Sequence, residues 1–118
     1  MIEFLKTVFK TKNIELEAKL QPTPDNTFGG KAEVEFESWS DGTGNIEAEI
    51  KHSGIPDGTE VEVVCGGNPI AKMAVLNGFA KAIHEFDDLN PTPNFSTGDR
   101  VQFLLEGIPI FQGQFIPD

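Results

Sequence analysis

A strict alternation of apolar and charged residues marks three early segments of this chain, residues 14–20, 32–37 and 46–51. Successive side chains of a β-strand point to opposite faces, so a two-residue period predicts strands rather than helices. In each segment one parity is Ile, Leu, Val, Ala or Phe, and the other is Glu or Lys. We therefore expect three strands that bury one face and present a charged face to water.

Five later segments are also predicted to be strands, and they are less polar on their second face. They are residues 59–65, 69–76, 79–86, 100–106 and 110–116. The first keeps the alternation as far as Val64, whereas the other four carry apolar residues on both parities. Two explanations stay open: either the core covers both faces of these strands, or one face is a contact surface.

Turn-forming residues between the expected strands indicate the fold class. The sharpest turn signal is Asn77-Gly78, which favours a two-residue hairpin because a type I′ turn needs positive φ at both positions. Residues 87–98 form a longer connection with two prolines, typical of a crossing between sheets or of a functional loop. About eight strands joined by short turns predict an all-β, antiparallel immunoglobulin-like β-sandwich, or a small barrel. We expect residues 1–118 to form this single domain.

The first residues differ from this pattern and are expected to form an N-terminal arm over residues 1–12. Ile2, Leu5 and Phe9 share one face of a helix, whereas the alternation of Phe4 with Lys6 fits a strand nearly as well. A short helix and an extra strand both stay open. The arm lacks the continuous apolar stretch and the cleavage site of a signal peptide. That fits a cytoplasmic protein or a trimmed secreted one, and location stays open.

Charge and composition exclude several classes of partner. The chain has 19 acidic and nine basic side chains and a formal charge of −10. Such a charge repels phosphate backbones and anionic headgroups, so we expect neither nucleic acid nor membrane as a partner. No apolar run reaches the roughly 20 residues of a membrane-spanning helix. With 38% hydrophobic residues, the chain is apolar enough to fold.

Residues for catalysis are sparse. Neither histidine, His52 or His84, lies in a recognisable catalytic motif. Zinc is disfavoured because Cys65 is the only cysteine and no His-x-His spacing occurs. Cys65 is expected to be a structural thiol, and Trp39 to cover the end of the sandwich. We therefore expect a protein that is not an enzyme; a hydrolytic enzyme that uses carboxylates with one histidine is an alternative.

Glutamates form the most distinctive pattern of the chain. They occupy alternate positions of four expected strands: Glu15, Glu17, Glu33, Glu35, Glu37, Glu47, Glu49, Glu60 and Glu62. Parity places them opposite the apolar side chains, so neighbouring strands would share an anionic face. Such a face either attracts cations or basic partners, or keeps the protein soluble and its strand edges unpaired.

Calcium is the one cofactor that the sequence leaves open. Asp41, Thr43 and Asn45 place oxygen donors on alternate residues of a Gly-rich loop, and Asp87 with Asp88 offers a second oxygen cluster. Neither cluster follows the EF-hand pattern, and the backbone needs of a tight turn explain the first loop equally well. A calcium-stabilised surface domain is therefore a second alternative function.

From residue 54 onward the order of turns resembles a loosely defined group of proteins. The motifs are Gly54-Ile55-Pro56-Asp57-Gly58-Thr59, Gly67-Asn68-Pro69-Ile70, Asn77-Gly78-Phe79-Ala80, Thr97-Gly98-Asp99-Arg100-Val101 and Phe111-Gln112-Gly113-Gln114-Phe115. This order is similar to small uncharacterised bacterial β-sandwich proteins in which a Pro-x-Gly-Thr turn introduces a hairpin. It is more distantly similar to the extracellular CHRD-type sandwich. The resemblance implies a bacterial β-sandwich and brings no activity with it.

These observations predict a non-enzymatic interaction or structural module that binds a protein partner or a second copy of itself as a homodimer. The contact residues are expected to be those that break the alternation, together with the apolar residues of the arm. They are Ile2, Phe4, Leu5, Phe9, Val64, Leu76, Leu104 and Ile116.

Overall fold

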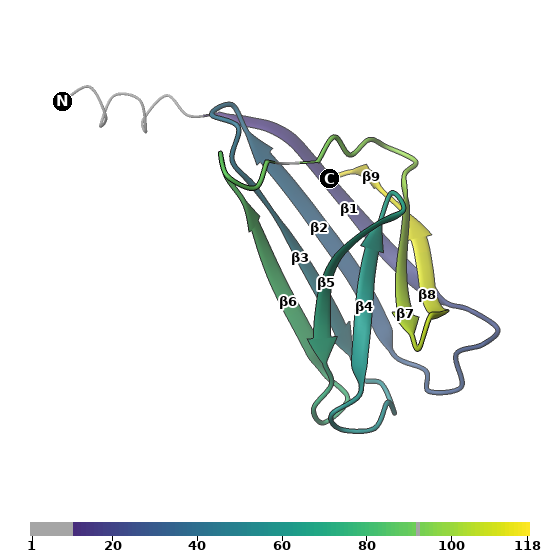
Figure 1. The fold of residues 1–118 in the computed structure, drawn as a ribbon. Coiled ribbons are helices and arrows are strands. Elements are labelled where there is room, and N and C mark those ends of the chain that lie inside the picture. The colour runs from purple at the N-terminus through teal and green to yellow at the C-terminus, as the bar shows by residue number, and fades with distance from the viewer. Residues whose placement is uncertain (1–10, 92) are drawn as a thin grey trace.

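Strands make up all the regular structure that the computed structural model describes, which covers residues 11–91 and 93–118 (Figure 1). They are β1 (Lys12–Pro22), β2 (Lys31–Trp39), β3 (Gly44–Lys51), β4 (Glu60–Cys65), β5 (Asn68–Ala74), β6 (Ala80–Phe86), β7 (Arg100–Leu105), β8 (Ile108–Gln114) and β9 (Ile116–Pro117). The all-β class is confirmed, and each of the eight expected strands is present. The helix or strand expected for the arm falls almost wholly on residues 1–10, outside the described residues.

The strands form one antiparallel sheet in the order β5-β4-β7-β8-β1-β2-β3-β6, and β9 pairs with β1. Figure 1 shows β1, β2, β3 and β6 as a long layer behind β5, β4, β7 and β8. The two layers are joined through β1, which pairs with β2 along its length and with β8 at Gln21 and Pro22. The first and last strands of this order, β5 and β6, approach each other, so the sheet is nearly closed into a barrel.

The turn between β5 and β6 is the hairpin that the sequence predicts. Asn77 and Gly78 have φ angles of 54° and 76°. Leu76 and Phe79 exchange two backbone hydrogen bonds across the turn, of 2.8 and 3.0 Å. A Cβ at Gly78 would overlap the carbonyl oxygen of Ser53, so the position needs glycine for space as well as for its φ. This turn joins the front layer to the back layer.

The connections between layers follow Greek-key order. The chain crosses from β3 to β4, forms the hairpin β4–β5, returns to β6 and crosses again to β7. The spatial orders 3-6-5-4 and 6-5-4-7 each combine three consecutive strands with a fourth reached by a long connection. Residues 87–98, which the sequence marks as a crossing or a functional loop, lead from β6 in the back layer to β7 in the front layer.

The core lies between the two layers, and six buried phenylalanines pack among its aliphatic side chains. Phe36 of β2 is 1% exposed, and its ring contacts Phe95 edge to face at a centroid distance of 5.0 Å. Phe115 packs against both rings. Phe103 and Phe111 form a second pair in the front layer at 6.2 Å. Phe95 belongs to the long crossing, so that segment also contributes to the core.

Candidate interaction surface

The outer side of the back layer is an acidic face, defined here as the outward side chains of β1, β2, β3 and β6. Strand register arranges its carboxylates in rows across the sheet, because Glu17 faces Glu35 and Glu35 faces Glu47. In the neighbouring rows Glu15 faces Glu37, and Glu33 faces Glu49. The predicted separation of charged and apolar faces is confirmed for these strands.

Two glutamates of the predicted array lie elsewhere. Glu60 and Glu62 belong to β4 in the front layer, where they face Ala74 and Lys72 of β5. The sequence predicted a shared anionic face only for strands that are neighbours, and β4 is not a neighbour of β1, β2 or β3. Alternation reports which face of a strand is outside but not which layer contains the strand.

Glu35 lies in the most crowded row of the acidic face. The Glu35 side chain is exposed, and its partial desolvation against the sheet is the largest cause that raises the pKa of its carboxyl; the charges of Glu33, Asp118, Glu47 and Glu17 raise it further. Only Glu47 of the row Glu17–Glu35–Glu47 has an ion pair among the described residues, with Lys81 at 2.8 Å. Row neighbours of like charge destabilise a sheet, so the centre of this face stores electrostatic repulsion.

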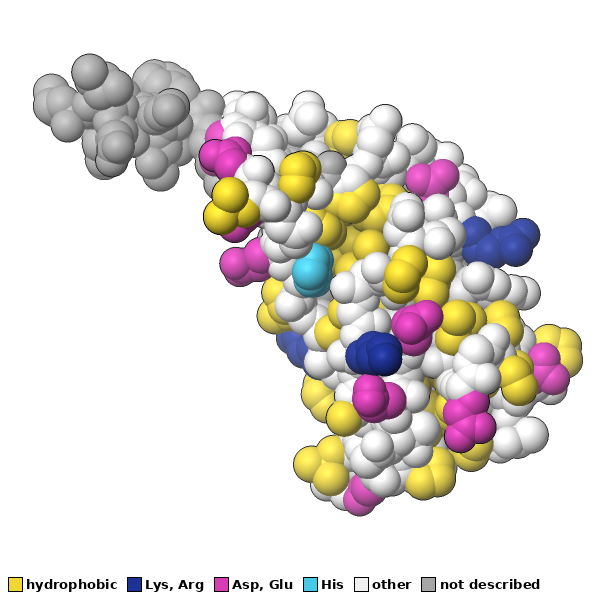
Figure 2. Space-filling model, in the orientation of Figure 1, with side chains coloured by type: hydrophobic (Ala, Val, Ile, Leu, Met, Phe, Trp, Pro, Cys, Tyr) yellow, Lys and Arg dark blue, Asp and Glu magenta, His cyan; other side chains and the backbone are white. Residues whose placement is uncertain are grey.

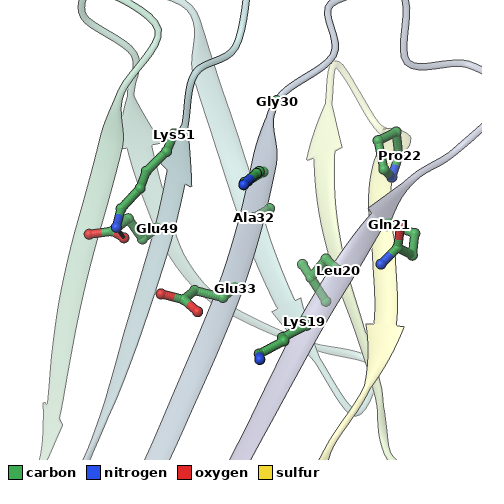
Figure 3. A pocket seen from close by; sticks show the side chains of 10 residues that line it. Lys19, Leu20, Gln21, Pro22, Gly30, Ala32, Glu33, Glu49 and Lys51 are labelled. Atoms are coloured by element: carbon green, nitrogen blue, oxygen red, sulfur yellow. Dashed lines mark ion pairs between the residues drawn. The ribbon is translucent and has the colours of Figure 1, made fainter.

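An open hollow of about 440 Å³ occupies the lysine-bearing end of the same face (Figure 3). Its charged side chains are Lys19, Lys31, Lys51, Glu33 and Glu49. Figure 3 shows Lys51 turned onto Glu49, and the two ends are 3.0 Å apart. The opposite charges of this hollow are thus mixed within it, and they favour neither an anion nor a cation.

The calcium candidates lie at the end of the molecule where β2 and β3 meet. Asp41 accepts hydrogen bonds from the backbone N–H and the hydroxyl of Thr43, at 3.0 and 2.7 Å. Asp87 accepts from the N–H groups of Leu89 and Asn90, both at 2.9 Å. In each case one carboxylate oxygen stabilises its own turn.

The fold brings parts of these two clusters together. Thr43, Asn45 and Asp87 line one hollow of about 300 Å³, and Glu85 lines it as well. Asp41 and Asp88 do not line it. Among the described residues, no three His, Cys, Asp or Glu side chains gather as a metal site.

The two histidines lie toward opposite ends of the β3–β6 pair. His52 follows β3 in an exposed turn with a φ of 56°. His84 faces Ile46 in the register, and its ring packs against Phe86 at 4.9 Å. The Nε2 atom of His84 lies 3.1 Å from the side-chain amide of Asn90. The fold therefore does not bring the histidines to one place.

Cys65 and Trp39 have structural surroundings. Cys65 is fully buried in the core, and burial raises the pKa of its thiol to about 12. Such a thiol stays protonated at neutral pH. Trp39 is half-buried at the end of β2, and the ammonium group of Lys12 lies 5.2 Å from its ring centre.

The expected contact residues fall into three groups. Val64 is only 9% exposed; the ladder shifts register between Val63 and Val64, and such a bulge redirects side chains. The contact role expected for Val64 required an exposed side chain, and this side chain is buried. Leu104 is half-buried, whereas Leu76 and Ile116 are exposed. The arm residues Ile2, Phe4, Leu5 and Phe9 lie outside the described residues.

Exposed apolar side chains are concentrated on β6 and on the turns at its two ends. We call this stretch, residues 76–89, the edge segment. Six large hydrophobic side chains are exposed among the described residues, and four of them belong to the edge segment: Leu76 (62%), Phe79 (44%), Ile83 (60%) and Leu89 (96%). Figure 2 shows hydrophobic side chains along the side of the molecule that β6 forms. Sequence reasoning named only Leu76, although apolar residues on both parities of 79–86 were the signal for the others.

The backbone of β6 is also open on one side. One edge of β6 pairs with β3, and the described residues form no ladder on its other edge beyond the Leu76–Phe79 bridge. Phe79 uses its N–H and C=O on that side. Backbone groups alternate in direction along a strand, so Lys81, Ile83 and Glu85 also present theirs there. Asn90 donates to the Glu85 carbonyl at 3.5 Å, which agrees with this direction.

Comparisons with known proteins add no relative. No protein-family model matches the chain, and a search of curated proteins gave no match. The described part of the chain contains no helix with the length and apolarity needed to cross a bilayer.

Proposed function

We propose that this protein is a non-enzymatic interaction module that binds an extended protein segment along the open edge of β6. The observation that carries the proposal is the coincidence of two features on one strand. The edge segment holds four of the six exposed large hydrophobics among the described residues. The backbone groups of Lys81 and Ile83 and the N–H of Glu85 point to the edge of β6 that pairs with no strand among the described residues, although β5 approaches that edge near the turn.

The physical basis is strand addition. An extended segment supplies hydrogen bonds to the open backbone groups, and alternate side chains decide which segment fits. Proteins that avoid this usually protect an edge with proline, bulges or adjacent charges. Residues 79–86 contain neither proline nor glycine. Their charged side chains, Lys81 and Glu85, are opposite in sign, and Ile83 lies exposed between them.

Charge restricts the partner. The chain carries a formal charge of −10, and the row beside Ile83 consists of Glu47, Glu35 and Glu17. A strand placed next to β6 would extend this face, so an acidic strand would be repelled. The favoured partner segment is therefore apolar with basic side chains, or one whose charges match those of β6 locally.

A probe peptide tests the proposal. The probe is Thr-Lys-Ile-Thr-Ile-Lys-Thr, titrated into the ¹⁵N-labelled full chain up to about 1 mM, where weak binding becomes measurable. We expect amide shifts concentrated in residues 79–86. A peptide of the same length with proline at its centre lacks a central N–H donor and should shift these amides far less. Shifts confined to another strand, or no shifts in a chain that is monomeric at the concentration used, would contradict the proposed function.

A calcium-stabilised surface domain is the second candidate function. The hollow that brings Thr43, Asn45 and Asp87 together is the observation that favours it. A ligand that binds only the folded state raises the free energy of unfolding, by about 2.7 kcal/mol when the free ligand is at a hundred times Kd, and so raises the melting temperature. The measurement is thermal unfolding in millimolar calcium and in chelator, and an unchanged melting temperature removes this candidate.

The finer classification of the fold belongs to the same proposal. We propose an immunoglobulin-like sandwich in the sense of two packed antiparallel layers with Greek-key connections. The proposal concerns architecture rather than strand order, because β1, β2 and β3 are neighbours in one layer here. The resemblance to small bacterial β-sandwich proteins and to the CHRD-type sandwich likewise stays a proposal, supported by the turns from residue 54 onward.

A further inference from the structure

We infer that the segment bound along β6 is β6 of a second copy of this chain, paired antiparallel about a two-fold axis at Ile83. The inference rests on the proposed function and specifies its partner. It depends on the open edge of β6, on the pattern of its charges and on the positions of the exposed apolar side chains.

The charges of β6 are self-complementary in this register. With Ile83 opposite the partner's Ile83, Lys81 lies opposite the partner's Glu85, and Glu85 lies opposite the partner's Lys81. The side chains of the three residues lie on the same outer face of β6. Their backbone N–H and C=O groups point to the edge that does not pair with β3. Opposite charges directly across an antiparallel pair stabilise it, and like charges destabilise it. The two-fold register thus produces two favourable contacts around a central apolar pair.

The exposed apolar side chains fit the same arrangement. Leu76 lies across the turn from Phe79 at the start of β6, and Leu89 follows the end of β6, so an antiparallel neighbour brings the Leu76 end of one copy to the Leu89 end of the other. Ile83 meets its symmetry mate at the centre. An isologous interface requires this kind of self-matching distribution, in which each residue near one end has a complement near the other.

The other open edge of the sheet has the features that block pairing. β5 contains Pro69 near its start and Lys72 in its middle, and proline cannot donate to a ladder. Each edge strand carries one lysine, and each lysine already has a glutamate beside it: Lys72 faces Glu62, and Lys81 pairs with Glu47. The proline, which β6 lacks, therefore distinguishes the two edges. Pairing through β6 is therefore favoured over pairing through β5.

The net charge of the chain opposes association only at long range. Residues 79–86 carry one Lys and one Glu and have a formal charge of zero, counting histidine as neutral. At 0.15 M ionic strength charges are screened beyond about 8 Å. Repulsion between the acidic faces therefore weakens at physiological salt, whereas the adjacent side chains across the two-fold axis still interact.

The experiment uses charge reversal in the full chain, with mass measured by sedimentation equilibrium between about 10 µM and 1 mM at 0.15 M salt. The wild-type chain of 12.9 kDa should approach twice its mass as concentration rises. Lys81→Glu places two Glu–Glu contacts at the axis, and Glu85→Lys places two Lys–Lys contacts there. Each variant alone should weaken dimerisation on the order of tenfold or more. An equimolar mixture of the two should restore a heterodimer.

Matched controls separate the edge from its surroundings. Glu47→Gln breaks the intramolecular ion pair of Lys81 without changing the edge, and should leave dimerisation within about twofold. Ile83→Asp should abolish dimerisation, while Ile116→Asp, at a site of similar exposure on β9, should not. Circular dichroism of each variant verifies that it is folded.

Two results would overturn the inference. One is a wild-type chain that stays monomeric at 1 mM, and the other is a dimer that Lys81→Glu and Ile83→Asp leave intact. The probe peptide separates this failure from that of the proposed function. A monomer whose 79–86 amides respond to the peptide is an edge-binding module with a different partner, whereas a monomer that ignores the peptide lacks both properties.

Discussion

Replacing Glu35 by glutamine tests the idea that the acidic face stores repulsion. Glu35 faces Glu17 on one side and Glu47 on the other. Glu35→Gln removes both like-charge contacts and keeps the shape of the side chain. Each such contact is worth about 0.2–1 kcal/mol in a sheet. Water screens the charge of this exposed side chain. We therefore take the lower half of the range for the two contacts together, about 0.5–1 kcal/mol of added stability.

The pH dependence follows from the direction of the pKa shift. The folded-state pKa of Glu35 is raised, first by partial desolvation and then by neighbouring carboxylates, so the fold favours its protonated form. The stability linked to this proton is present below the unfolded pKa and is lost as pH rises through the folded pKa. Glutamine imitates the protonated form. The gain from Glu35→Gln should therefore be full at pH 7 and vanish near pH 3.

Thermal unfolding measures the effect. For a domain of this length, 1 kcal/mol corresponds to about 3–6 °C, so the melting temperature should rise by about 2–6 °C at pH 7 and low salt. The rise should shrink in 1 M salt, where the Debye length is about 3 Å. Glu60→Gln is the control, because Glu60 faces Ala74. An unchanged or lower melting temperature for Glu35→Gln would refute the reasoning, as would a rise that persists at pH 3.

Three further changes test the turn, the core and the buried thiol. Gly78→Ala should cost on the order of 2 kcal/mol, because its φ of 76° and the Ser53 carbonyl both oppose a side chain; a melting temperature within 1 °C of wild type, against the several degrees expected, would contradict this. Phe36→Ala should cost about 3–5 kcal/mol in urea unfolding, because it empties the site beside Phe95. Cys65, whose pKa burial raises to about 12, should react with a disulfide reagent at pH 8 only after denaturant is added, so prompt labelling of the native chain would contradict its burial.

Local features of the fold were predictable from the sequence. The alternation in 14–20, 32–37 and 46–51 identifies three strands and their buried faces, because burial on one face is what produces a two-residue period. Asn77-Gly78 identifies its hairpin, because few residue pairs adopt positive φ twice. Both signals arise within a few residues of chain.

Features that depend on distant residues were not predictable. The layer of β4, and hence the position of Glu60 and Glu62, depends on pairing with β7. The bulge at Val64 depends on the register with β5. The open edge of β6 depends on which strands end the sheet, which no single segment encodes. Apolar residues on both parities of 79–86 indicated either a contact surface or a strand that the core covers on both faces. For Ile83, only the topology of the sheet decides between these two alternatives.

The position of β1 has a consequence for how the chain is made. β1 pairs at Gln21 with Gln112 and at Leu16 with Pro117, which follow these residues by 91 and 101 positions. A ribosome delivers chain from the N-terminus at about 5–20 residues per second, so β1 waits roughly 5–20 s for its second neighbour. The nascent chain can build hairpins locally in that time, but it joins its two layers through β1 only once β8 and β9 have been made.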